Sequence, residues 1–140
     1  MENETEKRIR AVKTDWETKK MPFLRSRFTV RKALTPAQKE RLRCGHIPRE
    51  MEDKWFWYME GNKLYAHRSW TGICVFILTI REGSDRIAVT VNRSPKEYRW
   101  SGLREEKETV CSLLDRWCGE EYDYYGEWLS ETVDAIEKSR

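Results

Sequence analysis

An arginine and a tryptophan stand two residues apart in the segment KLYAHRSWTG, residues 63–72, where they could bind an anionic ligand. A guanidinium is planar and holds a phosphate or a carboxylate through two parallel hydrogen bonds. An indole can stack on a base. What Arg68 and Trp70 can do therefore depends on which residues the neighbouring strands place beside them.

Four strands are expected around this segment, because aromatic and β-branched runs alternate with turn signals. The runs span about 54–60, 63–70, 73–81 and 86–92, with Gly61-Asn62, Thr71-Gly72 and Gly83-Ser84 between them. Glycine in the first position of a two-residue loop favours a type II′ hairpin turn, which fits the first and third connections. If every loop has two residues, counting predicts the pairs Trp55–Arg68, Asp53–Trp70, Arg68–Val75, His67–Phe76, Phe76–Val91 and Val75–Asn92.

Alternation then sorts the side chains of this antiparallel meander onto two faces. The first face is apolar and is expected to pack against two C-terminal helices; it holds Phe56, Tyr58, Tyr65, His67, Cys74, Phe76, Leu78, Ile80, Ile87, Val89 and Val91. The second face is mixed, with Trp55, Trp57, Met59, Ala66, Arg68, Trp70, Val75, Ile77, Thr90 and Asn92. Neighbouring strands lie ~4.8 Å apart, so the polar groups at one end of the mixed face can reach one small ligand. The predicted ligand-binding residues are Arg68, Trp55, Trp70, Asp53 and Asn92.

Two interpretations of this cluster stay open at the level of sequence. Arg68 could be satisfied by Asp53 or Glu52, with its guanidinium flat against Trp55 and with Asn92 holding a loop carbonyl. Alternatively, the guanidinium and the indoles form a pocket for a phosphate or a carboxylate. A slip of one residue in register would exchange the two faces and change either interpretation.

The candidate catalytic residues are Glu52, Asp53 and His67, in an arrangement where a carboxylate acts as general base and the histidine assists. A solvated acidic turn and a buried histidine explain the same residues without catalysis. No metal site or cofactor is predicted, because Cys44 and His46 are the only close pair of metal-ligating Cys and His. The four cysteines are interpreted as free thiols.

The rest of the chain supplies helices. Thr35 and Pro36 suit the start of a short helix that Gly45 ends. Apolar spacing predicts further helices over 103–118 and 126–138, while residues 28–30 suit a short strand. Residues 1–20 have a sparse apolar stripe and could form a loosely attached helical arm. The sequence thus predicts one α+β domain over residues 1–140, with a four-stranded antiparallel meander sheet, two C-terminal helices on one face and N-terminal helices.

The net charge of +3 is distributed unevenly. Residues 7–43 hold 13 Lys and Arg against 3 acidic residues, and residues 101–140 hold 5 against 11. A basic arm can bind phosphates, so a nucleic-acid binder is one alternative, although the acidic end would repel the same polymer. A protein-interaction module with exposed Trp57 and Trp16 is another. No membrane span and no signal peptide are predicted, which favours the cytoplasm; the oligomeric state stays open.

The stretch GHIPREMEDKWFWYMEGNKLYAHRSWTGICVF, residues 45–76, resembles a small uncharacterised bacterial family with a GHIPxEMEDKWF…HRSWTG signature. That family is associated with ADP-ribosylglycohydrolase-type proteins. The resemblance covers roughly a quarter of the chain and implies a link to ADP-ribose or NAD-derived nucleotides, and to bacterial or phage defence. The matching residues are Glu50, Glu52, Asp53, Trp55, His67, Arg68, Trp70 and Thr71.

The expected function is therefore the binding of a nucleotide-like, phosphate-bearing small molecule, with ADP-ribose or an NAD-derived compound preferred. The alternatives are a hydrolase or transferase that acts on ADP-ribosylated or NAD-type substrates, and a protein-interaction or nucleic-acid-binding module.

Overall fold

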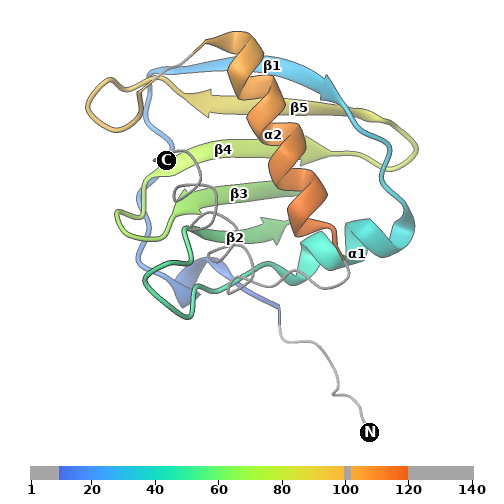
Figure 1. Cartoon of the computed structure of the whole chain (residues 1–140), viewed down its shortest axis with the longest axis horizontal. Helices are drawn as coiled ribbons and strands as arrows, with labels where there is room; N and C mark the ends of the chain where they lie inside the picture. The colour runs from blue at the N-terminus through green and yellow to red at the C-terminus, as the bar shows by residue number, and fades with distance from the viewer. Residues whose placement is uncertain (1–9, 100–101, 120–140) are drawn as a thin grey trace, which may run out of the picture.

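The structure is a computed structural model that describes residues 10–99 and 102–119. Its elements are η1 (Lys13–Asp15), β1 (Arg25–Arg31), α1 (Pro36–Cys44), β2 (Trp55–Glu60), β3 (Lys63–Arg68), β4 (Cys74–Ile80), β5 (Arg86–Asn92) and α2 (Leu103–Trp117). The strands form one antiparallel sheet in the order β1-β5-β4-β3-β2, and α2 crosses one of its faces (Figure 1). The prediction of an α+β fold with an antiparallel sheet is confirmed. The helix predicted over 126–138 lies outside the described residues.

The sheet has five strands, so the four-stranded prediction is one strand short. The additional strand, β1, pairs along its full length with β5, from Arg25 opposite Asn92 to Arg31 opposite Arg86. Only Phe28 and Val30 of this strand are buried, and arginines flank them. The sequence pattern therefore indicated a strand of three residues where seven are paired.

Both helices form for the reasons that the sequence indicates. The Thr35 hydroxyl accepts a hydrogen bond from the Gln38 amide at 3.1 Å, and the Gln38 side chain accepts one from the Thr35 amide at 2.9 Å. This capping box starts α1, and Gly45, at a φ of 71°, ends it. The α2 helix buries Val110, Leu113, Leu114 and Trp117 against the sheet, which confirms the helix predicted over 103–118.

The predicted register is right within two hairpins and wrong between them. The β2–β3 pairs include Trp55 opposite Arg68, and the β4–β5 pairs include Phe76 opposite Val91, both as expected. Between β3 and β4, however, Phe76 lies opposite Ala66 and not His67, and the register shifts again between Ala66 and His67. The connection has five residues, Ser69–Ile73, closed by a hydrogen bond from the Arg68 amide to the Ile73 carbonyl at 2.9 Å.

Because the register differs by one residue, the other face of β2 and β3 now lies on the same side of the sheet as the apolar face of β4 and β5. The core under α2 contains Trp55, Trp57, Leu64 and Ala66 together with Phe76, Leu78, Ile80, Ile87, Val89 and Val91. Phe56, Tyr58, Tyr65 and His67, which were expected on the α2 side, lie on the opposite face. Trp57 is fully buried, stacked on Trp117 with ring centroids 4.2 Å apart, so the expectation that it is exposed is wrong.

The chain segment before β1 covers the β2–β3 half of the face opposite α2. Within residues 10–20 only Lys13–Asp15 are helical, so the longer helix expected there does not form. Trp16 stacks on Phe56 with centroids 6.0 Å apart and donates from Nε1 to the Ser69 carbonyl at 2.9 Å. The β1, β5 and β4 half of the same face carries exposed and half-buried side chains.

Candidate functional site

Arg68 is the last residue of β3, and its guanidinium lies over an aromatic ring. The carbon Cζ is 4.9 Å from the centroid of the Trp55 ring, which is 7 % exposed and packs edge-on against Trp117. Such a cation–π contact contributes about 0.5–1 kcal/mol and orients the guanidinium. Trp55 is therefore placed to support Arg68 from inside the core, while the Arg68 side chain reaches the surface.

Trp70 is an exposed aromatic residue in a fixed orientation. Its side chain is 73 % exposed, yet Nε1 donates to the Met51 carbonyl at 2.7 Å. The loop that carries it is held at Ser69, whose amide donates to the Lys54 carbonyl at 2.9 Å and whose hydroxyl donates to the Asp53 carbonyl at 2.7 Å. A large aromatic side chain that is both exposed and anchored is suited to stacking.

Arg68 and Trp70 both line an open pocket of about 590 Å³. Among the described residues, its lining consists of Met51, Glu52, Lys54, Arg68, Trp70, Thr71, Ile73 and Glu97. The volume lies within the range of small-molecule sites, and the lining combines apolar surface with two cations and two carboxylates. Of the five residues predicted to bind a ligand, the structure brings these two together at a pocket.

Asp53 is fully buried and pairs with a histidine. Its Oδ2 accepts a hydrogen bond from Nε2 of His46, whose ring stacks on Trp57 with centroids 5.2 Å apart. Within the described part of the chain, its second oxygen, Oδ1, has no hydrogen-bond partner. Asp53 precedes β2 and does not pair with Trp70, because the β2–β3 pairing ends at Trp55 and Arg68. Sequence reasoning considered His46 only beside Cys44 and missed this pair.

Asn92 is also fully buried, and its side chain makes three hydrogen bonds within the described residues. Its Nδ2 donates to the Cys74 carbonyl at 2.9 Å and to Oε1 of Glu97 at 3.0 Å, and its Oδ1 accepts from the Ser94 amide at 2.8 Å. These contacts match the structural interpretation of Asn92 as a residue that holds a backbone carbonyl. Asn92 orients Glu97, which lines the pocket, and does not line the pocket itself.

His67 faces away from the pocket, toward the aromatic side chains on the other side of the sheet. It is 3 % exposed and stacks on Tyr58 with centroids 5.9 Å apart. Its Nδ1 donates to the Gly72 carbonyl at 3.0 Å, and burial lowers the pKa of the imidazole. Of the three catalytic candidates only Glu52 lines the pocket, so the structure does not assemble Glu52, Asp53 and His67 into one site.

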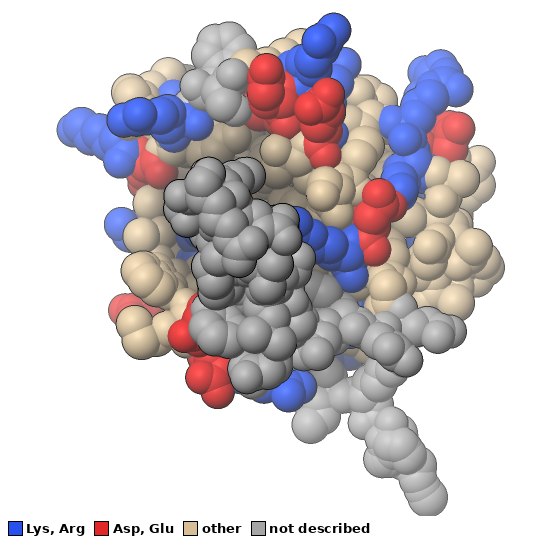
Figure 2. Space-filling model, in the orientation of Figure 1, with Lys and Arg blue, Asp and Glu red and all other residues tan. Residues whose placement is uncertain are grey.

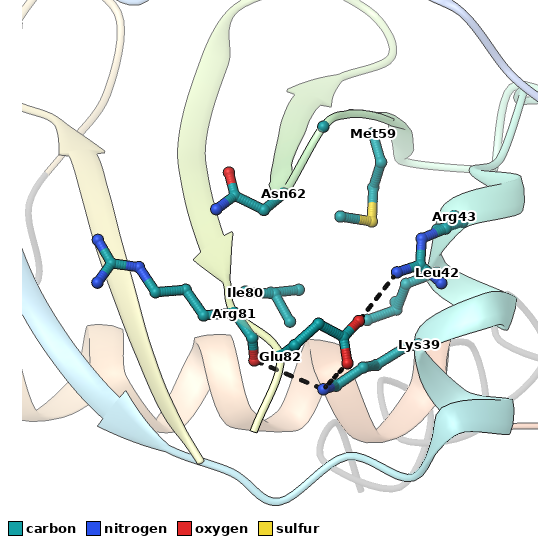
Figure 3. Close-up of a pocket in the computed structure, with 9 residues that line it drawn as sticks. Lys39, Leu42, Arg43, Met59, Asn62, Ile80, Arg81 and Glu82 are labelled. Carbon is teal, nitrogen blue, oxygen red and sulfur yellow. Dashed lines mark hydrogen bonds and ion pairs between the residues drawn. The ribbon is translucent and has the colours of Figure 1, made fainter. Parts of the chain in front are cut away.

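A second pocket, of about 310 Å³, lies between α1 and the ends of β2 and β4. Figure 3 shows Glu82 between two cations of α1 at its rim: Oε1 is 3.4 Å from Nζ of Lys39, and Oε2 is 3.3 Å from the Arg43 guanidinium. The apolar side chains of Met59, Leu42 and Ile80 line it together with Gly61, Asn62 and Arg81. The two α1 cations at this rim therefore both contact the carboxylate of Glu82.

Sequence reasoning missed several pocket residues. Three of them are sequence neighbours of residues named above: Met51 is next to Glu52, Lys54 is next to Asp53, and Ile73 is next to Cys74. Glu97 comes from the loop after β5, and no spacing signal connects it to Arg68. Among residues 10–99 and 102–119, no group of three or more His, Cys, Asp or Glu side chains could hold a metal ion. In the same residues, no helix has the length and apolar character that crossing a bilayer requires.

Comparisons of this chain with protein families, with curated proteins and with solved structures found no match. The resemblance to the family with the GHIPxEMEDKWF…HRSWTG signature therefore stays a prediction. A functional proposal for this chain rests on the chemistry of its pocket.

Proposed function

We propose that the pocket lined by Arg68 and Trp70 binds a nucleotide-like, phosphate-bearing small molecule, with ADP-ribose or an NAD-derived compound preferred. The observation that carries the proposal is the pairing of an anchored, exposed indole with a guanidinium in one pocket of about 590 Å³. Aromatic stacking and bidentate phosphate binding are the two contacts that a nucleotide needs most. The preference for ADP-ribose follows from the sequence resemblance.

The charged and aromatic residues of the pocket have roles in this proposal that fit their chemistry. Arg68 binds a phosphate, and Lys54 is the second cation of the lining. Trp70 stacks on the base, and the carboxylate of Glu52 accepts hydrogen bonds from ribose hydroxyls. Trp55 acts behind Arg68 through its cation–π contact. Asn92 acts through Glu97, and Asp53 through the backbone that anchors Ser69.

Binding is proposed in preference to turnover, because two of the three catalytic candidates lie outside this pocket. Asp53 is buried against His46, and His67 is buried on the other face of the sheet. Of the residues predicted to be catalytic, a hydrolase or transferase at this pocket would retain Glu52 alone. If Glu52 were a general base, Glu52→Gln would abolish turnover of NAD or ADP-ribosylated protein while binding persisted.

The first experiment is a thermal-shift measurement with ADP-ribose, NAD, AMP and inorganic phosphate. A ligand at about a hundred times its Kd adds ~2.7 kcal/mol to the free energy of unfolding, which is a shift of several degrees for a domain of this size. Stabilisation by the nucleotides at concentrations where phosphate alone has no effect supports the proposal. The absence of any shift with all three nucleotides contradicts it.

Variants then locate the ligand. Arg68→Ala removes a charge-assisted hydrogen bond and should weaken binding by roughly 10- to 100-fold. Trp70→Ala should weaken it by a comparable factor through the lost stacking. Arg81→Ala is the matched control, because it removes an exposed arginine that lines the second pocket (Figure 3). If Arg81→Ala weakens binding and Arg68→Ala does not, the ligand occupies the second pocket and the proposal is wrong.

A further inference from the structure

Four arginines project from the half of the sheet that the N-terminal segment leaves uncovered. In β1, Phe28 and Val30 pack into the core under α2, so alternation directs Arg25, Arg27, Thr29 and Arg31 to the opposite face. In β5, Ile87, Val89 and Val91 belong to the same core, so Arg86, Ala88 and Thr90 also point away from α2. Arg25, Arg27, Arg31 and Arg86 are all exposed and are called the arginine face below.

The arginine face extends along the whole of β1. Arg25 and Arg31 are six residues apart on one strand, which spans roughly 20 Å at about 3.4 Å per residue. Arg31 lies directly opposite Arg86 across the β1–β5 pairing. The side chains that continue this surface toward β4 are small: Thr29 is opposite Ala88, and Ala88 is opposite Thr79. A chain of phosphates could therefore lie along β1 beside these small side chains.

Few acidic groups neutralise these cations. Arg31 is 3.9 Å from Asp85, with both side chains at least half exposed. Within the residues that the structure describes, the side chains of Arg27 and Arg86 form no ion pair. On the α2 side, by contrast, Lys and Arg are interspersed with Asp and Glu (Figure 2). Like charges directly opposite one another destabilise a sheet, as with Arg31 and Arg86, so this cluster has a cost to stability that binding a polyanion would offset.

An exposed aromatic ring stands at one end of the arginine face. Phe23 is 93 % exposed and Leu24 is 55 % exposed, immediately before β1 begins. The loop is held by Arg25, whose guanidinium donates to the carbonyls of Pro22 at 2.9 Å and Met21 at 3.2 Å. Proteins that bind single-stranded nucleic acid without sequence preference combine two features. A cationic surface runs along the sugar-phosphate backbone, and a nearby aromatic ring stacks on a base.

We propose that the arginine face binds the sugar-phosphate backbone of single-stranded nucleic acid, and that Phe23 stacks on one of its bases. Arginine suits this role because its guanidinium donates two parallel hydrogen bonds to a phosphate, as Arg27, Arg31 and Arg86 would do. Arg25, which donates to Pro22 and Met21, would contribute its charge. The site is separate from the pocket of Arg68 and Trp70, because none of its residues lines that pocket. A small-molecule ligand and a nucleic acid would therefore contact different residues.

The test is fluorescence anisotropy with a labelled single-stranded oligothymidylate of about 15 nucleotides. This length is near the upper site size of a single OB-fold domain that binds single strands. With four phosphate contacts, the logarithm of the association constant should fall against the logarithm of salt concentration with a slope of about −2.8. Affinity should then drop roughly 50-fold between about 50 and 200 mM salt. A slope near zero, or no binding at low salt, would overturn the proposal.

Paired variants separate this face from net charge. Arg27→Glu with Arg86→Glu should weaken binding at least about tenfold and lower the salt slope by about 1.4 or more. The matched control is Arg104→Glu with Lys107→Glu on α2, which changes net charge equally on the other side of the sheet. Circular dichroism and the melting temperature establish that both variants fold. An equal loss of binding in the control overturns the proposal.

Phe23→Ala tests the stacking contact and should weaken binding of the oligothymidylate roughly tenfold with an unchanged salt slope. No loss of binding would contradict the role of Phe23. A duplex of the same length should bind more weakly than the single strand, since its bases are stacked on one another; equal or tighter duplex binding contradicts the single-strand assignment. Phosphatidylserine vesicles are the remaining probe. Binding to vesicles without binding to the oligonucleotide would assign the face to a membrane surface and overturn the proposal.

Discussion

Replacing Glu106 should destabilise the protein strongly, because this carboxylate joins α2 to the end of β5 inside the protein. Glu106 is 1 % exposed, and its two oxygens each accept a hydrogen bond from the Arg93 guanidinium at 2.7 Å. The Tyr98 hydroxyl donates a third hydrogen bond at 3.0 Å. The loop between β5 and α2 also carries Glu97, which lines the candidate pocket, so this network links the stability of the fold to the site.

The magnitude follows from burial. Removing one partner of a buried ion pair costs about 3–5 kcal/mol, because the remaining charge is left buried. Arg93 retains 17 % side-chain exposure, which lets water compensate in part, so the lower end of that range applies to Glu106→Gln. We expect a loss of about 3 kcal/mol in the free energy of unfolding. With a urea m-value of about 1.5 kcal/mol/M, the midpoint of unfolding should fall by about 2 M.

The assay is urea unfolding followed by far-UV circular dichroism, with Glu105→Gln as the matched control. Glu105 occupies the same first turn of α2 but is exposed. Both substitutions remove a negative charge from a helix N-terminus, which contributes about 0.3–1 kcal/mol, so their difference isolates the buried pair. A difference of less than about 1 kcal/mol between the two variants would refute the reasoning.

Three other predictions follow from buried groups and close contacts. Burial lowers the pKa of His67 in the folded protein, so the unfolded state binds more protons at acidic pH. The free energy of unfolding should therefore fall as pH drops below about 6.5, by at most about 1.4 kcal/mol per pH unit. Urea unfolding at several pH values should show this slope reduced in His67→Gln; equal slopes would contradict it. Gly72→Ala should lower the free energy of unfolding more than Gly83→Ala does in the same assay. The angle φ is positive at both positions, but a Cβ at Gly72 would lie 2.5 Å from the Glu17 carbonyl oxygen, whereas a Cβ at Gly83 has no atom within 4 Å. Burial raises the pKa of the Cys74 thiol to about 12, so iodoacetamide at about pH 8 should modify Cys74 only after unfolding; rapid modification of the native protein, measured by mass spectrometry, would contradict this.

Local signals in the sequence predicted most of the fold. Thr35, Pro36 and Gly45 predicted the bounds of α1, the apolar stripe predicted α2, and glycine turns predicted the β2–β3 and β4–β5 hairpins. The β3–β4 connection could not be predicted in the same way. Thr71-Gly72 resembles a two-residue turn, but Gly72 lies against the Glu17 carbonyl in a five-residue loop, and a contact with a distant segment sets that geometry.

The candidate site was predictable where it depends on neighbours in sequence. Arg68 and Trp70 flank the end of β3, so a count of residues placed them together with Trp55 nearby. The prediction that Asp53 and Asn92 contact the ligand came from strand pairing, which indicates which residues lie opposite one another. Strand pairing does not indicate which residues are buried, and both side chains are buried. Their partners, His46 and Glu97, come from an isolated bridge before β2 and from a loop, where strand periodicity carries no information.

The most direct test of the proposed pocket is the nuclear magnetic resonance signal of the Trp70 indole N–H during titration with ADP-ribose. The protein contains seven tryptophans, so Trp70→Phe identifies this signal by its disappearance. We predict that the Trp70 resonance shifts on binding while that of Trp117, the buried last residue of α2, stays in place. Saturable binding of ADP-ribose that leaves the Trp70 resonance unchanged would contradict the proposed site.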